Sequence, residues 1–322
     1  MISITKLLVA AATLAAMMPV AHAADYPTKP VHVIVPYAAG GPSDTGARLA
    51  AEPLGRQLGK SVVVENRGGA GGLIATEAYL HEVPDGYTIL VGAIGPLTII
   101  PAAKKVSYDP LKDFIPLGTV WRSALTLAVR PGMGVKTVTE FVAYAKAHPG
   151  KVTIGSAGVG SITHLAIELL KYKARIDVIH VPFRSTSGSL PALMGGQIDA
   201  LFGDTPSIAP QIKAGKILAL AVASPVREAA LPEVPTMAEA GFPGVEAGSW
   251  FGFVVAAKTP PAIVKRLQEA LVAAQKDPAY VATLAKHGAS AGDLGPASFE
   301  DLIKKDSAKW KAVVAAAGIK FD

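Results

Sequence analysis

Residues 31–58 read VHVIVPYAAGGPSDTGARLAAEPLGRQL and contain an apolar run, a glycine turn and a helical pattern in succession. The run VHVIV at 31–35 is rich in β-branched residues, which is typical of a strand covered on both faces in a parallel sheet. Apolar residues then recur at helical spacing over 43–58, and Ser43 or Asp44 stands where a helix cap is expected. Because strands and helices alternate in this way in βαβ units, the stretch predicts an α/β fold.

The same alternation continues along the chain in two sets. The capping boxes Thr137-x-x-Glu140 and Thr236-x-x-Glu239 each predict the start of a helix. Further strands are expected at 61–65, 87–91, 125–129, 152–154, 178–181, 200–202 and 218–223. Further helices are expected at 137–148, 161–172, 189–194, 263–275, 278–286 and 298–316.

Two βαβ sets of similar size predict two α/β lobes rather than one domain. The helices of the tail have no strands of their own, so we expect them to pack on the first lobe. Lobe 1 is then discontinuous, with residues 24–124 and 249–322, and residues 125–248 form lobe 2. The chain crosses between the lobes near 122–125 and near 246–252, and two crossings form a hinge that allows closure around a ligand.

The first 23 residues, MISITKLLVAAATLAAMMPVAHA, have the layout of a secretory signal peptide. Lys6 is followed by an apolar stretch over 7–20 and by the small-residue pattern Ala21-His22-Ala23. A membrane anchor is the alternative, but the apolar stretch is shorter than the roughly 20 residues that a helix needs to span a bilayer. We therefore expect export and cleavage after Ala23.

The composition excludes several classes of protein. Of 322 residues, 50% are hydrophobic and 17% charged, so the chain has ample surface to bury and is not disordered. The absence of cysteine excludes disulfides, thiolate metal sites and a cysteine nucleophile. Cleavage after residue 23 removes one of the 31 basic residues and no acidic residue, so the net charge falls from +6 to +5. The remaining charges are scattered, so we expect no nucleic-acid partner.

Two glycine-rich turns follow strands, at the places where α/β sheets bind ligands. One is PYAAGGPSD at 36–44, and the other is GSAGVGSITH at 155–164. Each leads into a helix, whose first backbone N–H groups and positive dipole end favour an anion. The alternative is that both turns are only tight connections. Because one turn falls in each lobe, we predict a shared cleft for an anionic ligand.

Motifs for nucleotide binding, metal binding and catalysis are absent or incomplete. No phosphate-binding loop or dinucleotide fingerprint has the required glycine spacing, and the sequence contains no Gly-x-Ser-x-Gly or His-Glu-x-x-His motif. His164 and Glu168 lie one helical turn apart, but a third metal ligand is not evident. The alternative function is a hydrolase that uses Ser43 or Ser161 with His164. An adjacent Ser43 and Asp44 at a helix start are, however, more often caps than catalysts.

A set of segments, taken in order, covers essentially the whole chain after residue 23. They are YPTKPVHVIVPYAAGGPSDTGAR (26–48), VVVENRGGAGGLIATE (62–77), PDGYTILVG (84–92), GSAGVGSITHLAIELL (155–170), VIHVPFRST (178–186), ALMGGQIDALFGDTPS (192–207), IKAGKILALAVAS (212–224), LPEVPTMAEAGFPG (231–244) and SWFGFVV (249–255). Each is weak alone, but the combination is specific. It resembles the Bug or TctC-type solute-binding receptors of tripartite tricarboxylate transporters.

The resemblance implies a type II periplasmic-binding-protein fold, in which two α/β lobes joined by two crossover strands close like a Venus flytrap. It implies a periplasmic receptor that binds a small carboxylated molecule and presents it to membrane transporter subunits. We expect a monomer without catalytic residues, metal or cofactor. Signalling to a membrane sensor kinase is an alternative output that the sequence leaves open.

Matched residue by residue, the resemblance points to ligand contacts in both lobes. The chain departs from the family at 182–185, where relatives commonly read Pro-Tyr-Lys-Gly and this chain reads Pro-Phe-Arg-Ser. Arg184 can form a bidentate pair where Lys cannot, so we expect it to engage a second anionic group of the ligand. The other implied contacts are Tyr37, Ala39, Gly41, Asp44 and Ala93 in lobe 1, with Ser156, Gly160, Ser161, Thr163, His164 and Asp204 in lobe 2.

Overall fold

The computed structural model describes residues 26–291 and 295–317. The signal peptide predicted at 1–23 and its cleavage site therefore lie outside the described residues. Within the described ranges, no helix is both long enough and apolar enough to cross a membrane.

Strands and helices alternate along most of the chain, as the sequence predicts. The strands are β1 (Val31–Val35), β2 (Val62–Asn66), β3 (Thr88–Ala93), β4 (Phe114–Val129), β5 (Thr153–Ser156), β6 (Ile179–Pro182), β7 (Ala200–Asp204), β8 (Leu218–Val222) and β9 (Gly248–Ala256). The α-helices are α2 (Pro42–Leu58), α3 (Leu73–Tyr79), α4 (Ile100–Ala103), α5 (Val138–Ala147), α6 (Ile162–Ala174), α7 (Thr186–Met194), α8 (Thr205–Lys213), α9 (Pro261–Gln275), α10 (Pro278–Lys286) and α11 (Pro296–Ala317). Two short helical segments are η3 (Ala70–Gly72) and η4 (Gly95–Ile99).

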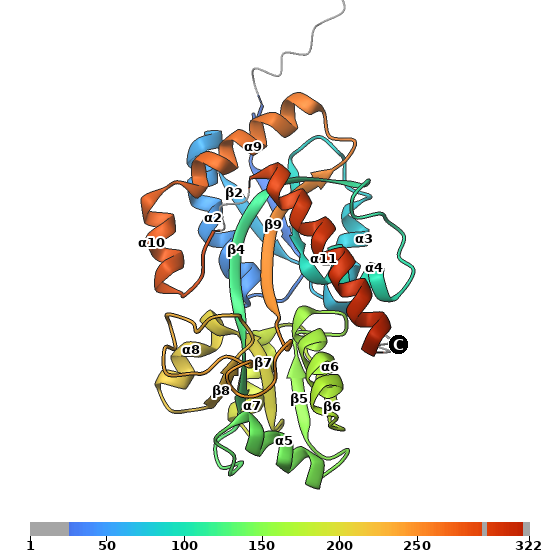
Figure 1. Cartoon of the computed structure of the whole chain (residues 1–322). Helices are drawn as coiled ribbons and strands as arrows, with labels where there is room; N and C mark the ends of the chain where they lie inside the picture. Colours follow the sequence, from blue (N-terminus) through green and yellow to red (C-terminus); the bar gives the residue numbers. More distant parts are fainter. Residues whose placement is uncertain (1–25, 292–294, 318–322) are drawn as a thin grey trace, which may run out of the picture.

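The strands form one sheet that runs through two lobes (Figure 1). In lobe 1, β2, β1 and β3 are parallel, and β9 and the first part of β4 extend them in antiparallel fashion. From Leu125 onward, β4 pairs instead with β7 and β8, and the parallel strands β5 and β6 complete lobe 2. The lobes are thus joined by β4 and by the segment that leads into β9, because Ala247 still bonds to Ala223 whereas Gly248 already pairs with Ala124.

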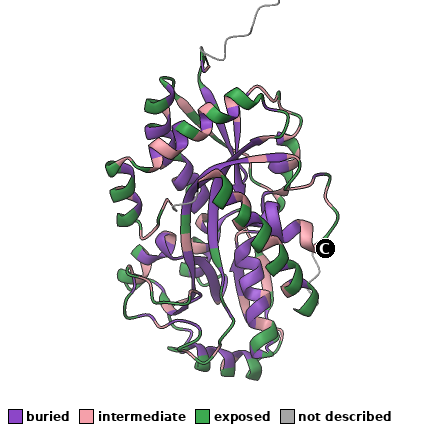
Figure 2. Cartoon of the chain, turned by 45° about the horizontal axis from the view of Figure 1, so that its top comes forward, coloured by how far each residue is buried: buried purple, intermediate pink, exposed green. Residues whose placement is uncertain are grey.

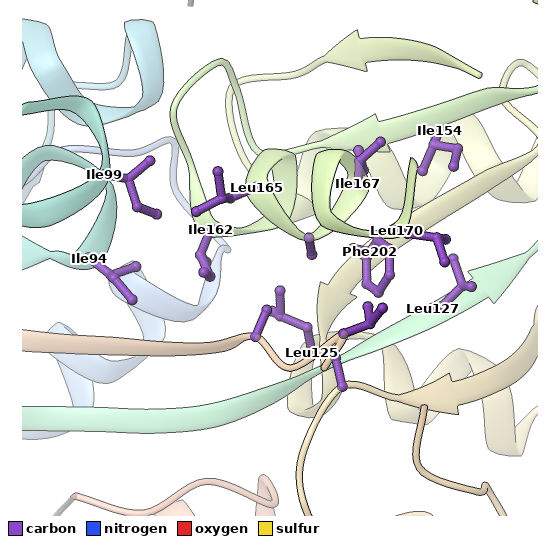
Figure 3. Packing of buried hydrophobic residues seen from close by; sticks show 14 of the residues in the cluster. Ile94, Ile99, Leu125, Leu127, Ile154, Ile162, Leu165, Ile167, Leu170 and Phe202 are labelled. Carbon is purple, nitrogen blue, oxygen red and sulfur yellow. The ribbon is translucent and has the colours of Figure 1, made fainter. Parts of the chain in front are cut away.

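Helices cover the sheet, so its central strands are buried, whereas the edge strands β2 and β6 and the outer helix faces are partly or fully exposed (Figure 2). In lobe 1, α2, α9 and α10 pack on one face around Trp121, Leu54 and Leu267. The largest apolar cluster continues from lobe 1 into lobe 2: Ile99 of η4 belongs to the same cluster as Leu165 of α6 (Figure 3). Fully burying one such side chain contributes about 1.5–3 kcal/mol. This shared apolar contact therefore stabilises the lobes in their close arrangement.

The helix after β1 is capped differently from the prediction. It begins at Pro42 with Gly41 as its N-cap, and no side chain caps it. Proline at the first position has no N–H, so one fewer donor needs a partner there. The Asp44 carboxylate instead accepts from the Gly40 N–H and pairs with Arg48 at 2.9 Å. The predicted cap by Ser43 or Asp44 is therefore wrong.

The two predicted capping boxes have different outcomes. Thr137 accepts from the Glu140 N–H at the start of α5, which confirms the first. Thr236 and Glu239 also exchange both hydrogen bonds of the motif, but residues 236–241 form a turn rather than the predicted helix. The reason is local: Gly241 adopts a left-handed conformation (φ +92°), which ends the turn before a helix can extend.

Candidate functional site

A narrow cavity lies between the lobes where four helices begin. It is lined by the first residues of α2, α6 and α7 and by Asp204, the N-cap residue of α8, together with residues of β9 and of the loops after β1, β3 and β5. The two glycine-rich turns predicted from the sequence therefore face each other across it. The lining residues are Tyr37, Gly41, Pro42, Ser43, Ile94, Ala157, Ser161, Ile162, Thr163, Ser185, Thr186, Asp204, Ser249 and Phe251.

The helix starts make this cavity a favourable place for an anion. The first backbone N–H groups of a helix have no acceptor within the helix, and the N-terminus carries about half a positive charge from the aligned peptide dipoles. Three such ends line the cavity, at Pro42, Ile162 and Thr186, and a fourth helix begins at Thr205, next to the lining residue Asp204. A carboxylate placed among them gains both hydrogen-bond donors and a favourable potential.

Two hydroxyl groups of the wall are buried without a hydrogen-bond partner among the described residues. They belong to Thr186, the first residue of α7, and to Ser249 in β9. Leaving a buried hydroxyl unpaired costs about 1–3 kcal/mol, so such groups mark places where a ligand or water completes the bonding. Neither Thr186 nor Ser249 is predicted from the sequence to contact the ligand. Nothing in their local sequence distinguishes them, because they become neighbours only when the lobes meet.

Asp204 contributes the acidic group of the cavity. It is the N-cap residue of α8, yet its carboxylate does not cap that helix. The carboxylate instead accepts from the Ser123 hydroxyl at 2.9 Å. Burial raises the pKa of Asp204 to about 6, and the hydroxyls of Ser249 and Ser123 oppose that rise. The Ser249 hydroxyl therefore lies near this carboxylate, but without a hydrogen bond of good geometry.

The glycine-rich turn of lobe 2 is held by its own hydroxyls. Ser161 donates to the Gly158 carbonyl at 2.7 Å and caps α6 by accepting from the His164 N–H. Thr163 accepts from the Ala157 N–H at 2.8 Å. These bonds fix the turn so that Ser161 and Thr163 lie in the cavity wall.

Two stacked histidines support this turn from behind. The rings of His164 and His180 lie 3.9 Å apart and 13° from parallel. Nδ1 of His164 accepts from the Gly160 N–H at 3.2 Å, and Nε2 of His180 lies 2.6 Å from the Ser156 hydroxyl. Burial is the main cause that lowers the pKa of His164 to about 3 and that of His180 to about 4, so both are neutral at pH 7. A neutral His164 can accept the Gly160 bond, whereas a protonated one cannot.

Tyr37 links the first glycine-rich turn to η3. Its hydroxyl donates to the Gly71 carbonyl at 2.9 Å, and its ring packs edge-on against Phe251. Burial raises the pKa of the Tyr37 phenol, so the hydroxyl stays protonated as a donor.

The lobes touch around the cavity. Ser187 at the start of α7 donates to the Ala39 carbonyl at 3.0 Å across the gap. Gly71 approaches the other lobe so closely that a Cβ added to it would lie 2.1 Å from the Val159 carbonyl oxygen. Closure therefore depends on glycine at this position.

Four other residues implied by the resemblance are not among those that line the cavity. Ala39 is exposed, and it meets lobe 2 only through its carbonyl. Asp44 is engaged by Arg48 and Gly40, and Ala93 is fully buried in the apolar core of lobe 1. The side chain of Arg184 is exposed, one residue before the lining residue Ser185.

The residues considered for catalysis and for metal binding have other partners in the structure. Of the residues considered for a hydrolase, Asp44 accepts from Arg48, and His164 accepts from the Gly160 N–H. No group of three potential metal ligands occurs among the described residues. His164 and Glu168 do approach each other, at 3.8 Å between Nε2 and Oε1.

The comparisons with known proteins agree across almost the whole chain. The model of the TctC family, described as the tripartite tricarboxylate transporter family receptor, matches residues 46–319. BugT of Bordetella pertussis (strain Tohama I) is 32% identical over 302 residues, which cover 92% of this chain and 91% of BugT. MatC (Rpa3494) from Rhodopseudomonas palustris, solved with bound malate, is 33% identical with a TM-score of 0.86, covering 90% of this chain and all of MatC. R. palustris Rpa4515, solved with adipate, is 32% identical with a TM-score of 0.87, covering 92% of this chain and 99% of Rpa4515. The chain is a member of the tripartite tricarboxylate transporter receptor (TctC) family.

Proposed function

We propose that this chain is a periplasmic receptor that binds a small carboxylate between its lobes and delivers it to the membrane subunits of a tripartite tricarboxylate-type transporter. The observation that carries the proposal is the convergence of three helix N-termini, and of the N-cap residue of a fourth helix, on a cavity whose wall holds two unpartnered buried hydroxyls. A carboxylate satisfies these donors, and a cation does not. The malate and adipate held by the relatives MatC and Rpa4515 support the same chemical class here.

In this proposal the ligand is held by groups from both lobes. Tyr37, Gly41 and Ser249 act from lobe 1. Ser161, Thr163, Thr186 and Asp204 act from lobe 2. Ser156, Gly160 and His164 shape the turn that carries Ser161. Arg184, beside the cavity wall, meets a second anionic group at the rim.

Closure follows from this division of contacts. We assign residues 24–124 and 249–322 to lobe 1 and residues 125–248 to lobe 2, with the hinge where β4 and β9 run side by side. Since a ligand reaches both sets of contacts only when the lobes are together, binding shifts the population toward the closed form. A closed, loaded receptor then differs in shape from an empty one, which allows a membrane partner to recognise it.

The proposed function also includes export to the periplasm, a monomeric state and the absence of catalysis. We infer that a signal peptide is cleaved after Ala23, that the receptor acts as a monomer and that it has no catalytic activity. N-terminal sequencing of protein recovered from the periplasm tests the cleavage, and a mature chain that still begins at Met1 contradicts it.

A thermal-shift panel on the mature protein tests the ligand class. Malate, adipate, succinate, glutamate and benzoate are compared with neutral sugars and divalent metal ions. A ligand present at 100 times its Kd adds about 2.7 kcal/mol to the free energy of unfolding, so a true ligand raises Tm clearly. We expect at least one carboxylate to do so. A shift with sugars or metals alone contradicts the proposal.

Recovery of the ligand separates a receptor from the hydrolase alternative. Protein incubated with the stabilising carboxylate, and separately with its methyl ester, is denatured and the solution is analysed by mass spectrometry. A receptor returns one intact molecule per chain, whereas turnover of the ester that is lost in Ser43→Ala or Ser161→Ala supports the hydrolase.

Crosslinking in membranes distinguishes the two outputs. A photo-crosslinker on the exposed surface of the loaded receptor should capture transporter subunits. Capture of a sensor kinase instead, with no transporter subunit, contradicts delivery to a transporter.

A further inference from the structure

The cavity combines anion-attracting helix ends with a buried acid, and this combination needs an explanation. The carboxyl group of Asp204 lies in the same wall as the starts of α2, α6 and α7. Asp204 is only 2% exposed, so water screens its charge poorly. Its N-cap position does not account for the orientation of the side chain, since it makes no capping bond.

The groups that face Asp204 cannot neutralise it. Ser123 on β4 donates one hydrogen bond, and Ser249 on β9 presents a hydroxyl without a bond. Tyr37 after β1 is the titratable neighbour, and it is a neutral phenol. The first residues of α6 and α7 in the wall are serines, threonines and an isoleucine. No charged side chain among the described residues acts on Asp204.

A carboxylate ligand therefore meets this acid at close range. Two carboxylates that share a poorly solvated site without a cation cannot both stay ionised, because each raises the pKa of the other. The ligand carboxylate is stabilised by several helix ends, whereas Asp204 is buried and its side-chain neighbours are neutral hydroxyls. When the ligand is bound, Asp204 is therefore the carboxyl group that is protonated.

We propose that the ligand carboxylate binds together with one proton from solvent, that this proton is held on Asp204, and that the neutral Asp204 carboxyl donates a hydrogen bond to the ligand. This inference rests on the proposed function and specifies how the site accepts its substrate class. It makes uptake sensitive to pH. Where Asp204 is ionised in the free receptor and protonated in the complex, affinity rises up to about tenfold for each unit by which the pH falls.

Calorimetric titration with malate and with adipate tests the proposal. Each titration is run at pH 7.5 in two buffers that differ in protonation enthalpy, so the difference in measured heat gives the number of protons bound. We expect close to one proton per ligand in the wild type. In Asp204→Asn we expect none, and an affinity that changes less than about twofold between pH 8 and pH 6.5, because the amide donates without titrating. Asp277→Asn, at the half-buried N-cap of α10 and outside the cavity wall, is the control and should keep the uptake.

The outcomes separate this inference from the function on which it rests. Binding of either ligand without proton uptake in the wild type overturns the inference and leaves the carboxylate receptor standing. Proton uptake that persists in Asp204→Asn assigns the proton elsewhere and also overturns it. If Asp204→Asn does not fold, the test rests on the wild type alone: the number of protons bound per ligand and the change of affinity with pH. If neither malate nor adipate binds, the same titration is run with the carboxylate that gave the largest thermal shift, and failure of the whole panel counts against the proposed function itself.

Discussion

The hydroxyl of Thr186 shows how a single side chain can identify a binding site. It lies at the first position of α7, it is buried, and no described residue offers it a hydrogen-bond partner. Thr259 provides a matched control. Its hydroxyl is also buried and without a partner among the described residues, but Thr259 does not line the cavity. Comparing variants of the two threonines therefore tests whether the unpartnered hydroxyl of Thr186 contacts the ligand or only lacks a partner, as that of Thr259 does.

Exchange of Thr186 for valine should weaken ligand binding without harming the fold. Thr186→Val keeps the shape and removes a hydroxyl that has no partner in the free protein, so Tm should stay or rise. A hydrogen bond to a charged group contributes about 1.5–3 kcal/mol, so carboxylate affinity should fall about 10-fold to 100-fold in calorimetry. Thr259→Val should leave affinity unchanged. Equal affinity in both variants removes Thr186 from the site.

The buried pair of His164 and His180 should make the free energy of unfolding depend on pH. Because the folded state lowers the pKa of His164 and His180, unfolded chains bind more protons below the ordinary histidine pKa of 6.5, and stability should fall as the pH drops from about 6.5 toward 4. Asp204 acts in the opposite direction between about pH 4 and 6, since its pKa is raised on folding. Comparison of variants therefore isolates the histidines.

Urea denaturation of His180→Gln at pH 7 and pH 4.5 provides that comparison. We expect a smaller loss of stability on acidification than in the wild type, because one of the two buried imidazoles no longer titrates. His81→Gln, at an exposed position, should follow the wild type. A pH slope in His180→Gln that equals both others shows that the pair does not titrate in this way.

At the scale of elements, strong local patterns were predictable and weak ones were not. The helix predicted at 278–286 matches α10, and the other tail helices differ from prediction by two residues or fewer, because their apolar spacing is regular. The first part of β4 was missed, since Pro116, Gly118 and Arg122 interrupt its pattern. Antiparallel pairing with β9, with register shifts near those positions, makes it a strand. Helix α8 was missed because it contains two prolines.

The short helix η3 allows a test of lobe closure, because its Gly71 contacts the turn before α6. In Gly71→Ala the added Cβ would meet the Val159 carbonyl, so the lobes cannot come as close as they do here. The left-handed φ of +64° adds a strain of about 1–2 kcal/mol for a non-glycine residue. Gly59→Ala is the matched control, because Gly59 has a φ of +72° with nothing within 4 Å of its Cβ position.

Small-angle X-ray scattering and calorimetry distinguish the two glycine variants. Both should lose similar stability, but only Gly71→Ala should bind carboxylate more weakly and remain more extended than the wild type at saturating ligand. If the two variants bind and compact alike, contact between η3 and the turn is not needed for closure.

At the scale of the whole molecule, the sequence located the cavity but not all of its wall. Strand ends and glycine turns identified both sides, and five residues expected from the family resemblance line it: Tyr37, Gly41, Ser161, Thr163 and Asp204. Ser249 could not be identified in this way, because its place in the wall depends on how β9 crosses between the lobes. The bond from the Gly160 N–H to His164 spans only four residues, but the stacking of His164 on His180 joins α6 to β6, and no local pattern encodes it.

The central claim is that this receptor closes on a carboxylate held by helix N-termini, and calorimetry on paired ligands tests it most directly. The carboxylate that stabilises the protein most is titrated beside its primary amide, which has nearly the same shape but no charge. We expect one carboxylate per chain, and an amide that binds at least about 100-fold more weakly, because it loses charge-assisted bonds and the favourable dipoles. An amide that binds as tightly as the carboxylate contradicts the account.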